Sequence, residues 1–427
     1  MIEPRVDWVR GDIYGLDIPS GAEAFRVGGE QFLTRALQAS GALSGKNRVA
    51  RIIGFEEFKG GGTGTKLLLT VEYETSLPSL HSELFVKFSR NFDDPIRDRA
   101  RHMLRPEIEF AALTQSFGFP VTVAECYFAD FHRESGTGIL ITRRIAYGSD
   151  GVEPHYIKCM DHLLPDPLGH YQSIMRVLGT LTGSHKAGLL ANSFYQDFPF
   201  DLDAAIAEDP LLYQGEKLVN RLARLIGFAE KYPRLLPENI RSSEFLSRFV
   251  DEVPQLVAKD QQIRQQLLSK PDFIALCHWN ANIDNAWFWR NDHGELKCGL
   301  IDWGAVGQMS VAKSIYGAFS GAGTDLWDNH LDTILATFIE AHAHSGGGVL
   351  NPAELRSHVL LFVGLMGVAY LLDAPAIIER RVPNLELITD PLDPALLQIE
   401  DARVQLHMLT MFLNQWQSRH IGQLLPS

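Results

Sequence analysis

Three polar residues near position 280 have side chains and a spacing that could hold a metal–phosphate complex. His278, Asn280 and Asn285 lie in "HWNANIDN", with the spacing H-x-N-x-x-x-x-N. Asp302 follows in "LIDWG", after a predicted β-hairpin that returns the chain towards its starting point. Amide and carboxylate oxygens are hard ligands that suit Mg²⁺, and Mg²⁺ bridges nucleotide phosphates. The hairpin would bring Asn285 and Asp302 together as candidate oxygen ligands for such a metal ion.

Two features nearer the N-terminus could contact phosphate as well. The turn "KGGGTGTK" is rich in glycine, which lets a backbone approach a phosphate; its glycines are Gly60, Gly61, Gly62 and Gly64. A flexible hairpin tip explains the same residues, and no Walker A sequence or helix follows. Lys87 in "LFVKFS" either covers an edge strand or points into a cleft. Glu107 could reach that lysine from the next predicted helix, or it could be a surface charge.

The composition is that of a folded globular protein with room for two lobes. The chain has 427 residues, of which 45% are hydrophobic and 21% are charged. The net charge of −13 disfavours a sequence-independent nucleic-acid binder, which needs a basic face. This acidity could serve solubility or attract a cationic substrate.

Cysteine usage and apolar runs indicate a cytoplasmic protein without a membrane span. The four cysteines are scattered, which argues against a disulfide framework. The N-terminal segment "MIEPRVDWVRGD" lacks the apolar stretch of a signal peptide. The longest apolar run, Val359–Leu372, is shorter than the ~20 residues that span a bilayer, so we expect a buried helix there.

Hydrophobic periodicity divides the chain into a β-rich part and a helical part. A helix is expected over 29–43, strands over 48–58, 65–74, 83–89, 121–130 and 137–145, and a helix over 98–118. From about residue 167 the chain is mainly helical, with breaks expected at Pro199, Pro233 and Pro254 and a hairpin between residues 286 and 301. We predict an α+β, bilobal fold with an N-terminal lobe of residues 1–143 and a C-terminal lobe of residues 144–427.

These motifs together resemble the aminoglycoside phosphotransferase and choline kinase group, which are small-molecule kinases with a protein-kinase-like fold. That group has the pattern HGD-x-x-x-x-N followed by I/L-D-W/F, and "HWNANIDN" and "LIDWG" stand in those places. "PEIEFAAL" resembles its Glu-x-x-Phe helix, "GILITRRI" its hinge strand and "KGGGTGTK" its phosphate loop. The similarity extends from about Val49 to Glu340 and is specific only around residues 278–304.

The resemblance implies a role for each matching residue. Lys87 would contact the α- and β-phosphates of ATP, and Glu107 would pair with it. His278 would brace the catalytic loop, while Asn285 and Asp302 would bind Mg²⁺. The acceptor would be a small molecule bound by the helical lobe.

Asn280 stands where that group has its catalytic base. An asparagine amide cannot take up a proton at neutral pH, and losing a general base typically costs ~10²–10⁴ in rate. Phosphoryl transfer depends mainly on positioning and charge neutralisation, so slow transfer is physically possible. Trp279 also departs from the group's glycine and could narrow the acceptor side or stack on an acceptor ring. Two hypotheses follow: a slow phosphotransferase, or an inactive binding module for nucleotide or another small molecule.

Two further alternatives concern the acceptor and a different metal. Asp325 and Asp328 in "TDLWD" could face a cationic acceptor or could only cap a helix. Cys277, His278, His293 and Cys298 could be drawn as a zinc site, but their spacing fits no common structural zinc pattern. The sequence does not identify the acceptor.

Overall fold

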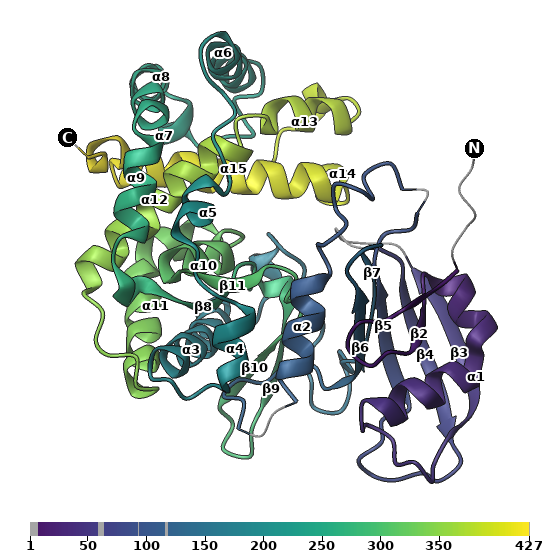
Figure 1. The fold of residues 1–427 in the computed structure, drawn as a ribbon. Helices are drawn as coiled ribbons and strands as arrows, with labels where there is room; N and C mark the ends of the chain where they lie inside the picture. Colours follow the sequence, from purple (N-terminus) through teal and green to yellow (C-terminus); the bar gives the residue numbers. More distant parts are fainter. Residues whose placement is uncertain (1–6, 59–63, 93, 116–117, 427) are drawn as a thin grey trace. The chain divides into compact units, whose positions relative to one another are not determined.

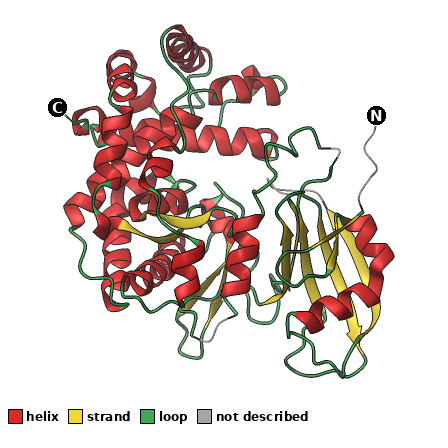
Figure 2. Cartoon of the chain, in the orientation of Figure 1, coloured by secondary structure: helices red, strands yellow, loops and turns green. Residues whose placement is uncertain are grey.

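The computed structural model describes residues 7–58, 64–92, 94–115 and 118–426 (Figure 1). The chain forms two compact units. Unit 1 contains Met1–Val152, Leu190–Phe198 and Gly299–Val306, and unit 2 contains Glu153–Leu189, Pro199–Cys298 and Gly307–Ser427. Strands dominate unit 1 and helices dominate unit 2 (Figure 2), which confirms the predicted α+β class.

The main sheet of unit 1 is antiparallel, with strand order β3-β4-β5-β7-β6. Its strands are β3 (Val49–Phe58), β4 (Lys66–Tyr73), β5 (Glu83–Phe88), β6 (Cys126–His132) and β7 (Thr137–Arg143), and a separate pair joins β1 (Trp8–Arg10) to β2 (Asp17–Pro19). Alternate residues of β5, namely Leu84, Val86 and Phe88, pack into one core with the helix α1 (Ala22–Ala39). Successive side chains of a strand face opposite ways, so Lys87 lies on the other face.

Helix α2 (Arg105–Leu113) covers that other face of the sheet. Leu104 and Ile108 pack there against Ala129 and Phe131 of β6 and Leu140 of β7. The helix is shorter than the predicted 98–118, because Pro106 occupies its first turn, a position that proline favours, and residues 98–104 form turns instead. Glu107 in the first turn of α2 is therefore held on the same face as Lys87.

Unit 1 also includes two segments from beyond the single boundary predicted after residue 143. Aromatic packing holds them: Trp303 stacks on Phe110 at 4.2 Å between ring centroids, and Phe194 of α4 (Asn192–Asp197) stacks on Phe119 at 5.4 Å. A bridge between Val123 and Leu300 adds a backbone connection. Long-range aromatic contacts, which no local pattern encodes, thus place Asp302 in unit 1.

Unit 2 consists mainly of helices and includes most of two small two-stranded sheets, one of β9 and β10 and one of β8 and β11. The strands are β8 (Ile274–His278), β9 (Ala286–Arg290), β10 (Leu296–Leu300) and β11 (Val306–Ser310). The helices are α3 (Pro167–Lys186), α5 (Leu202–Ala207), α6 (Glu216–Lys231), α7 (Glu238–Arg241), α8 (Ser243–Ala258), α9 (Asp260–Leu268), α10 (Val311–Phe319), α11 (Thr324–His344), α12 (Pro352–Tyr370), α13 (Ala374–Arg381), α14 (Pro394–Leu397) and α15 (Glu400–Ser418). The predicted hairpin is present as β9 and β10.

Two helices of unit 2 contribute apolar side chains to its core. The predicted break at Pro254 is wrong, since this proline lies inside α8, where Phe249, Val253 and Leu256 remain buried and hold the helix in the core. Among the described residues, α12 alone is long and apolar enough to cross a membrane by length and composition, and 67% of its apolar window is buried in the protein. That burial is typical of the core helix that the sequence predicts around residues 359–372.

A buried carboxyl group at the start of α11 should make stability depend on pH. Asp161 accepts hydrogen bonds from Gly323 N at 2.8 Å and from the Tyr171 hydroxyl at 3.1 Å, and burial raises its pKa to about 6. Between its unfolded pKa and this value the folded protein binds the extra proton, so stability falls as pH rises through that window. Asp161→Asn should thus gain about 2–3 kcal/mol over the wild type at pH 7 and close to nothing below pH 4. Urea denaturation of both proteins across this range measures the difference, and a constant difference would contradict the prediction.

Candidate functional site

The best-defined polar group in unit 1 is an ion cluster around Lys87. Its ammonium lies 2.6 Å from Glu107 Oε2 and 2.6 Å from Asp302 Oδ1. The side chains of Lys87 and Glu107 are 5% and 7% exposed, whereas that of Asp302 is 47% exposed. The predicted pair of Lys87 and Glu107 is therefore present, and Asp302, 215 residues further along the chain, completes it. One cation is buried between two carboxylates, and only one of these carboxylates faces solvent.

The electrostatics of this cluster favour a charged lysine. Burial by itself lowers the pKa of Lys87, but the carboxylates of Glu107 and Asp302 outweigh burial and raise it above the ordinary value. Burial raises the pKa of Glu107, which Lys87 opposes. The ammonium is thus a permanent positive charge at the working pH of a cell.

Lys66 is a second cation on this face, and the sequence reasoning missed it. Lys66 of β4 lies directly opposite Lys87 of β5 in the antiparallel register, and side chains of such pairs share a face of the sheet. Burial and the neighbouring Lys87 lower the pKa of Lys66. The sequence offered one indication, because Lys66 begins the strand after the glycine-rich turn. Its position opposite Lys87 follows only from the register in which β4 pairs with β5.

Asp302 is held in an unusual backbone conformation. Its φ of 61° lies in the left-handed region, which is uncommon for a residue with a side chain. The next residue anchors it, since the Trp303 indole donates to Leu300 O at 2.9 Å and stacks on Phe110 of α2. Among the described residues, five other non-glycine residues share this region, which aspartate and asparagine enter more readily than most residues.

The glycine-rich turn is described only in part. Gly60, Gly61 and Gly62 lie outside the described residues, so their predicted role stays a prediction. At Gly64, a Cβ atom would lie 2.2 Å from Ser89 O and 2.6 Å from Phe88 O. Close approach to the end of β5 therefore already requires glycine at position 64, whether or not a phosphate binds.

In unit 2 the segment after β8 is fixed by hydrogen bonds between neighbouring side chains and both backbone groups of Asn280. Asn280 N donates to His278 Nδ1 at 3.0 Å, and Asn285 Nδ2 donates to Asn280 O at 2.8 Å. Ser314 of α10 donates to His278 O at 2.7 Å. These bonds connect His278 to Asn280 and to α10. The bracing role of His278, like the roles of Asn280 and Asn285 in chemistry, stays a prediction.

Asn285 presents an oxygen that suits a metal. The Nδ2 atom of Asn285 donates to the Asn280 carbonyl, which can only accept a hydrogen bond. The Oδ1 atom of Asn285 therefore points away from that carbonyl. Asp302 offers a half-exposed carboxylate. Both are the hard oxygen donors that Mg²⁺ prefers, and so the donor chemistry fits. Since Asn285 belongs to unit 2 and Asp302 to unit 1, their joint coordination of one ion stays a prediction.

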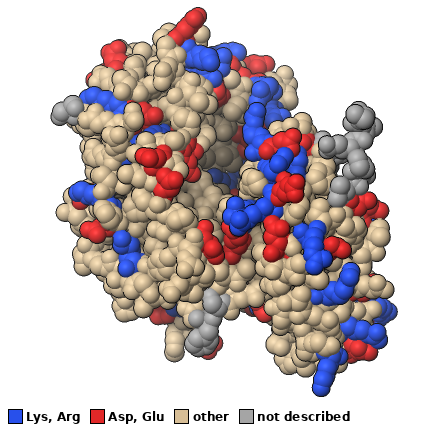
Figure 3. Space-filling model, in the orientation of Figure 1, with Lys and Arg blue, Asp and Glu red and all other residues tan. Residues whose placement is uncertain are grey.

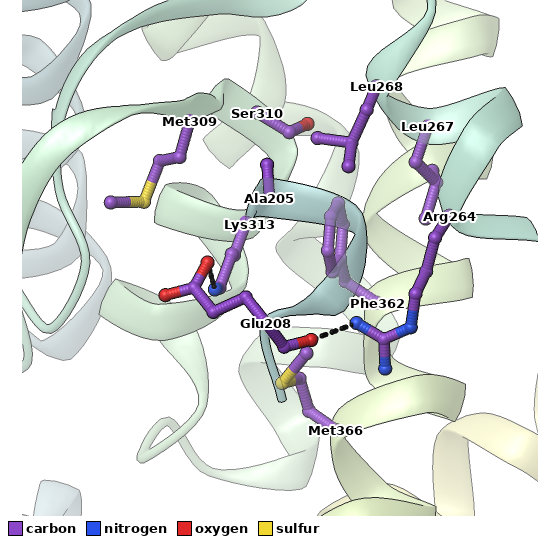
Figure 4. A pocket seen from close by; sticks show the side chains of 10 residues that line it. All are labelled: Ala205, Glu208, Arg264, Leu267, Leu268, Met309, Ser310, Lys313, Phe362 and Met366. Carbon is purple, nitrogen blue, oxygen red and sulfur yellow. Dashed lines mark hydrogen bonds and ion pairs between the residues drawn. The ribbon is translucent and has the colours of Figure 1, made fainter. Parts of the chain in front are cut away.

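Trp279 packs on α10 beside a charge cluster centred on the buried Lys313. The Lys313 ammonium lies 4.9 Å from the centroid of the Trp279 ring, within the range of a cation–π interaction. Lys313 also bonds to Glu208 Oε2 at 2.7 Å and Asp209 Oδ2 at 2.8 Å. Figure 4 shows Glu208 between Lys313 and Arg264, at a cavity of about 20 Å³ that has room for little more than one water molecule. The Lys313 ammonium is paired with the carboxylates of Glu208 and Asp209. We therefore interpret the cluster as a structural one that holds Lys313 against the Trp279 ring.

A glycine on α10 lets the loop approach this closely. A Cβ atom at Gly317 would lie 1.8 Å from Trp279 O. Gly317→Ala should therefore displace the loop and lower the free energy of unfolding by more than 2 kcal/mol, roughly the scale of overpacking. The matched control is Gly227→Ala in α6, which meets nothing within 4 Å and should stabilise the protein by about 0.5–1 kcal/mol. Denaturant unfolding of both variants tests the contact, and equal effects would argue against it.

The structure of unit 2 bears on the two remaining alternatives, namely the acidic residues of "TDLWD" and the zinc site. Asp328 accepts hydrogen bonds from Asn414 and Gln415 of α15 at 2.8–2.9 Å, so it joins two helices, and Asp325 lies in the first turn of α11. No group of three or more His, Cys, Asp or Glu side chains in the described part of the chain could hold a metal ion, which leaves the zinc alternative without support.

Comparison with known proteins gives similarity of structure only. No protein-family model and no curated protein sequence matches the chain. Among solved structures, a choline/ethanolamine kinase family protein from Mesorhizobium loti is 14% identical, with 92% of this chain and 97% of that chain covered and a TM-score of 0.42. Choline kinase from Cryptosporidium parvum is 12% identical, with 88% and 92% covered and a TM-score of 0.46.

A spectinomycin-bound structure appears in the same comparison. Spectinomycin phosphotransferase, solved in complex with ADP and spectinomycin, is 12% identical, with 91% of this chain and 98% of that chain covered and a TM-score of 0.40. Similarity at this level assigns neither an activity nor a residue role to this chain.

Proposed function

We propose that this protein binds ATP with Mg²⁺ and transfers the γ-phosphate slowly to a hydroxyl group of a small molecule. The observation that carries the proposal is the Lys87 cluster. A buried ion pair generally adds no stability over apolar packing, so folding alone does not account for a lysine at this position. A lysine fixed by one buried carboxylate, with a second carboxylate open to solvent, is suited to bind an anion together with its cation.

The charges of the cluster match those of a nucleotide with its metal. Lys87 would contact phosphate oxygens, and Lys66 adds a second positive charge on the same face of the sheet. The exposed Asp302 carboxylate would turn to Mg²⁺, which supplies charge neutralisation for the transferred group. On the face drawn in Figure 3, acidic and basic side chains lie next to one another.

Calorimetric titration with ATP, with and without Mg²⁺, tests this proposal. Mg²⁺-dependent binding is expected for the wild type, and Asp302→Ala should abolish the dependence on Mg²⁺. Asp98→Ala, which removes a carboxylate with a 90% exposed side chain, is the control and should bind like the wild type. Absence of ATP binding under both conditions would overturn the proposal, and unchanged Mg²⁺ dependence in Asp302→Ala would overturn the ligand assignment.

A second candidate function is a nucleotide-binding protein without transfer. One observation favours it: the oxygen of the Asn280 amide accepts a hydrogen bond from Asn282 Nδ2 and is thereby occupied within the loop. Single-turnover incubation with radiolabelled ATP separates the two functions, because only a phosphotransferase releases ADP and labelled product or phosphate above the rate of the Asp302→Ala variant.

A further inference from the structure

The orientation of the Asn282 amide is fixed by a backbone carbonyl. Asn282 Nδ2 donates to Gly317 O at 2.7 Å, and a carbonyl can only accept. The reversed amide would set its oxygen against Gly317 O and lose this bond. Asn282 is 1% exposed, so solvent offers no replacement. The nitrogen of Asn282 therefore faces α10, and both of its hydrogens are available as donors on that side.

The second hydrogen of this nitrogen fixes the neighbouring amide. Asn282 Nδ2 also lies 2.5 Å from Asn280 Oδ1. Since Asn282 offers a donor, the atom of Asn280 that faces it must be the oxygen. The backbone of Asn280 is held at both its N–H and its carbonyl. The amide nitrogen of Asn280 consequently lies on the branch that faces away from Asn282, on a side chain that is partly exposed.

We propose that Asn282 is a positioning residue that makes Asn280 a hydrogen-bond donor towards the bound molecule. Position 280 then favours an oxygen that accepts, such as a phosphoryl or carboxylate oxygen. It does not favour a hydroxyl group that must give up its proton. The nature of the bound oxygen rests on the proposed function. The direction of the Asn280 amide rests only on four hydrogen bonds, three within the loop and one to α10.

The first test measures proton exchange in the wild-type protein without nucleotide. With ¹⁵N-labelled asparagine, the side-chain NH₂ groups are assigned through connection to their own backbone. Both Asn282 protons are expected to exchange about tenfold or more slowly than those of Asn280, because only the former are buried and bonded. Equal rates, or slower exchange at Asn280, would overturn the proposal.

The second test introduces a carboxyl group at position 280, whose pKa reports whether Asn282 donates a hydrogen bond to it. In Asn280→Asp, the Asn282 N–H would stabilise the charged carboxylate and lower its pKa. Adding Asn282→Ala should raise the pKa of the introduced carboxyl by about one unit, as followed by ¹³C NMR titration. An unchanged pKa would overturn the assignment. If Asn282→Ala does not fold, Asn282→Leu removes the donor with a neutral side chain of similar size, and again a raised pKa is expected. None of these measurements uses nucleotide, so their failure is distinct from failure to bind ATP.

Discussion

Lys87→Met is expected to lower the free energy of unfolding by about 3–5 kcal/mol at neutral pH, the cost of leaving a buried carboxylate without its cation. The Glu107 side chain is only 7% exposed, so water cannot replace the ammonium. Asp302, at 47% exposure, would remain solvated and add little to the loss. Guanidinium denaturation of the variant beside the wild type measures the difference.

The pH dependence of this loss gives a sharper check. Without Lys87, burial would raise the pKa of Glu107 further, because the opposing positive charge is gone. The folded variant then takes up a proton that the unfolded chain does not hold, so the destabilisation grows as pH rises from about 5 to 8. A loss that is the same at both pH values would show that Glu107 does not carry it.

Two companion variants separate the buried charge from other causes. Lys87→Met/Glu107→Leu removes both partners and should recover most of the stability, because paired apolar groups pack without an unpaired charge. Lys297→Met, in an exposed pair with Glu295, should change stability by less than about 0.5 kcal/mol. Failure of the double variant to recover would mean that Lys87 stabilises the unit through packing of its aliphatic chain.

Asn280→Asp is expected to raise the rate of ATP hydrolysis by about 10²-fold, the lower range for restoring a general base. Asn282 Nδ2 would hold one oxygen of the new carboxylate, and the other oxygen would be free to accept a proton. As the oxygen of the attacking water bonds to the γ-phosphorus, the bond from that phosphorus to the bridging oxygen breaks. ADP leaves, and the water proton passes to the carboxylate. Release of ADP, measured without any other acceptor, reports this rate.

The control for this gain is Asn280→Ala, which removes the amide without supplying a base and should not exceed the wild-type rate. ATP affinity must be measured for all three proteins, so that a rate change is not mistaken for a binding change. If Asn280→Asp binds ATP as the wild type does and shows no gain, Trp279 or the acceptor side has diverged from a transferring arrangement.

Local patterns in the sequence determined the elements and the faces they present. Alternation in "ELFVKF" put Lys87 on the face opposite Leu84, Val86 and Phe88, and the helix after it supplied Glu107. The hairpin of β9 and β10 and the apolar helix near residue 360 were also predictable, because strand and helix periods are properties of neighbouring residues. The proximity of His278, Asn280 and Asn285 was predictable as well, because the three residues lie in one short loop.

Only the tertiary structure decided which of these residues meet. The contact of Lys87 with Asp302 spans 215 positions and depends on the stacking of Trp303 on Phe110, which no local period encodes. The register that sets Lys66 opposite Lys87 follows from strand pairing, and the orientation of the Asn280 amide follows from a carbonyl on α10. Sequence fixes how each element is built through short-range sterics and burial, whereas charge partners and amide orientations depend on packing between elements that are distant in the chain.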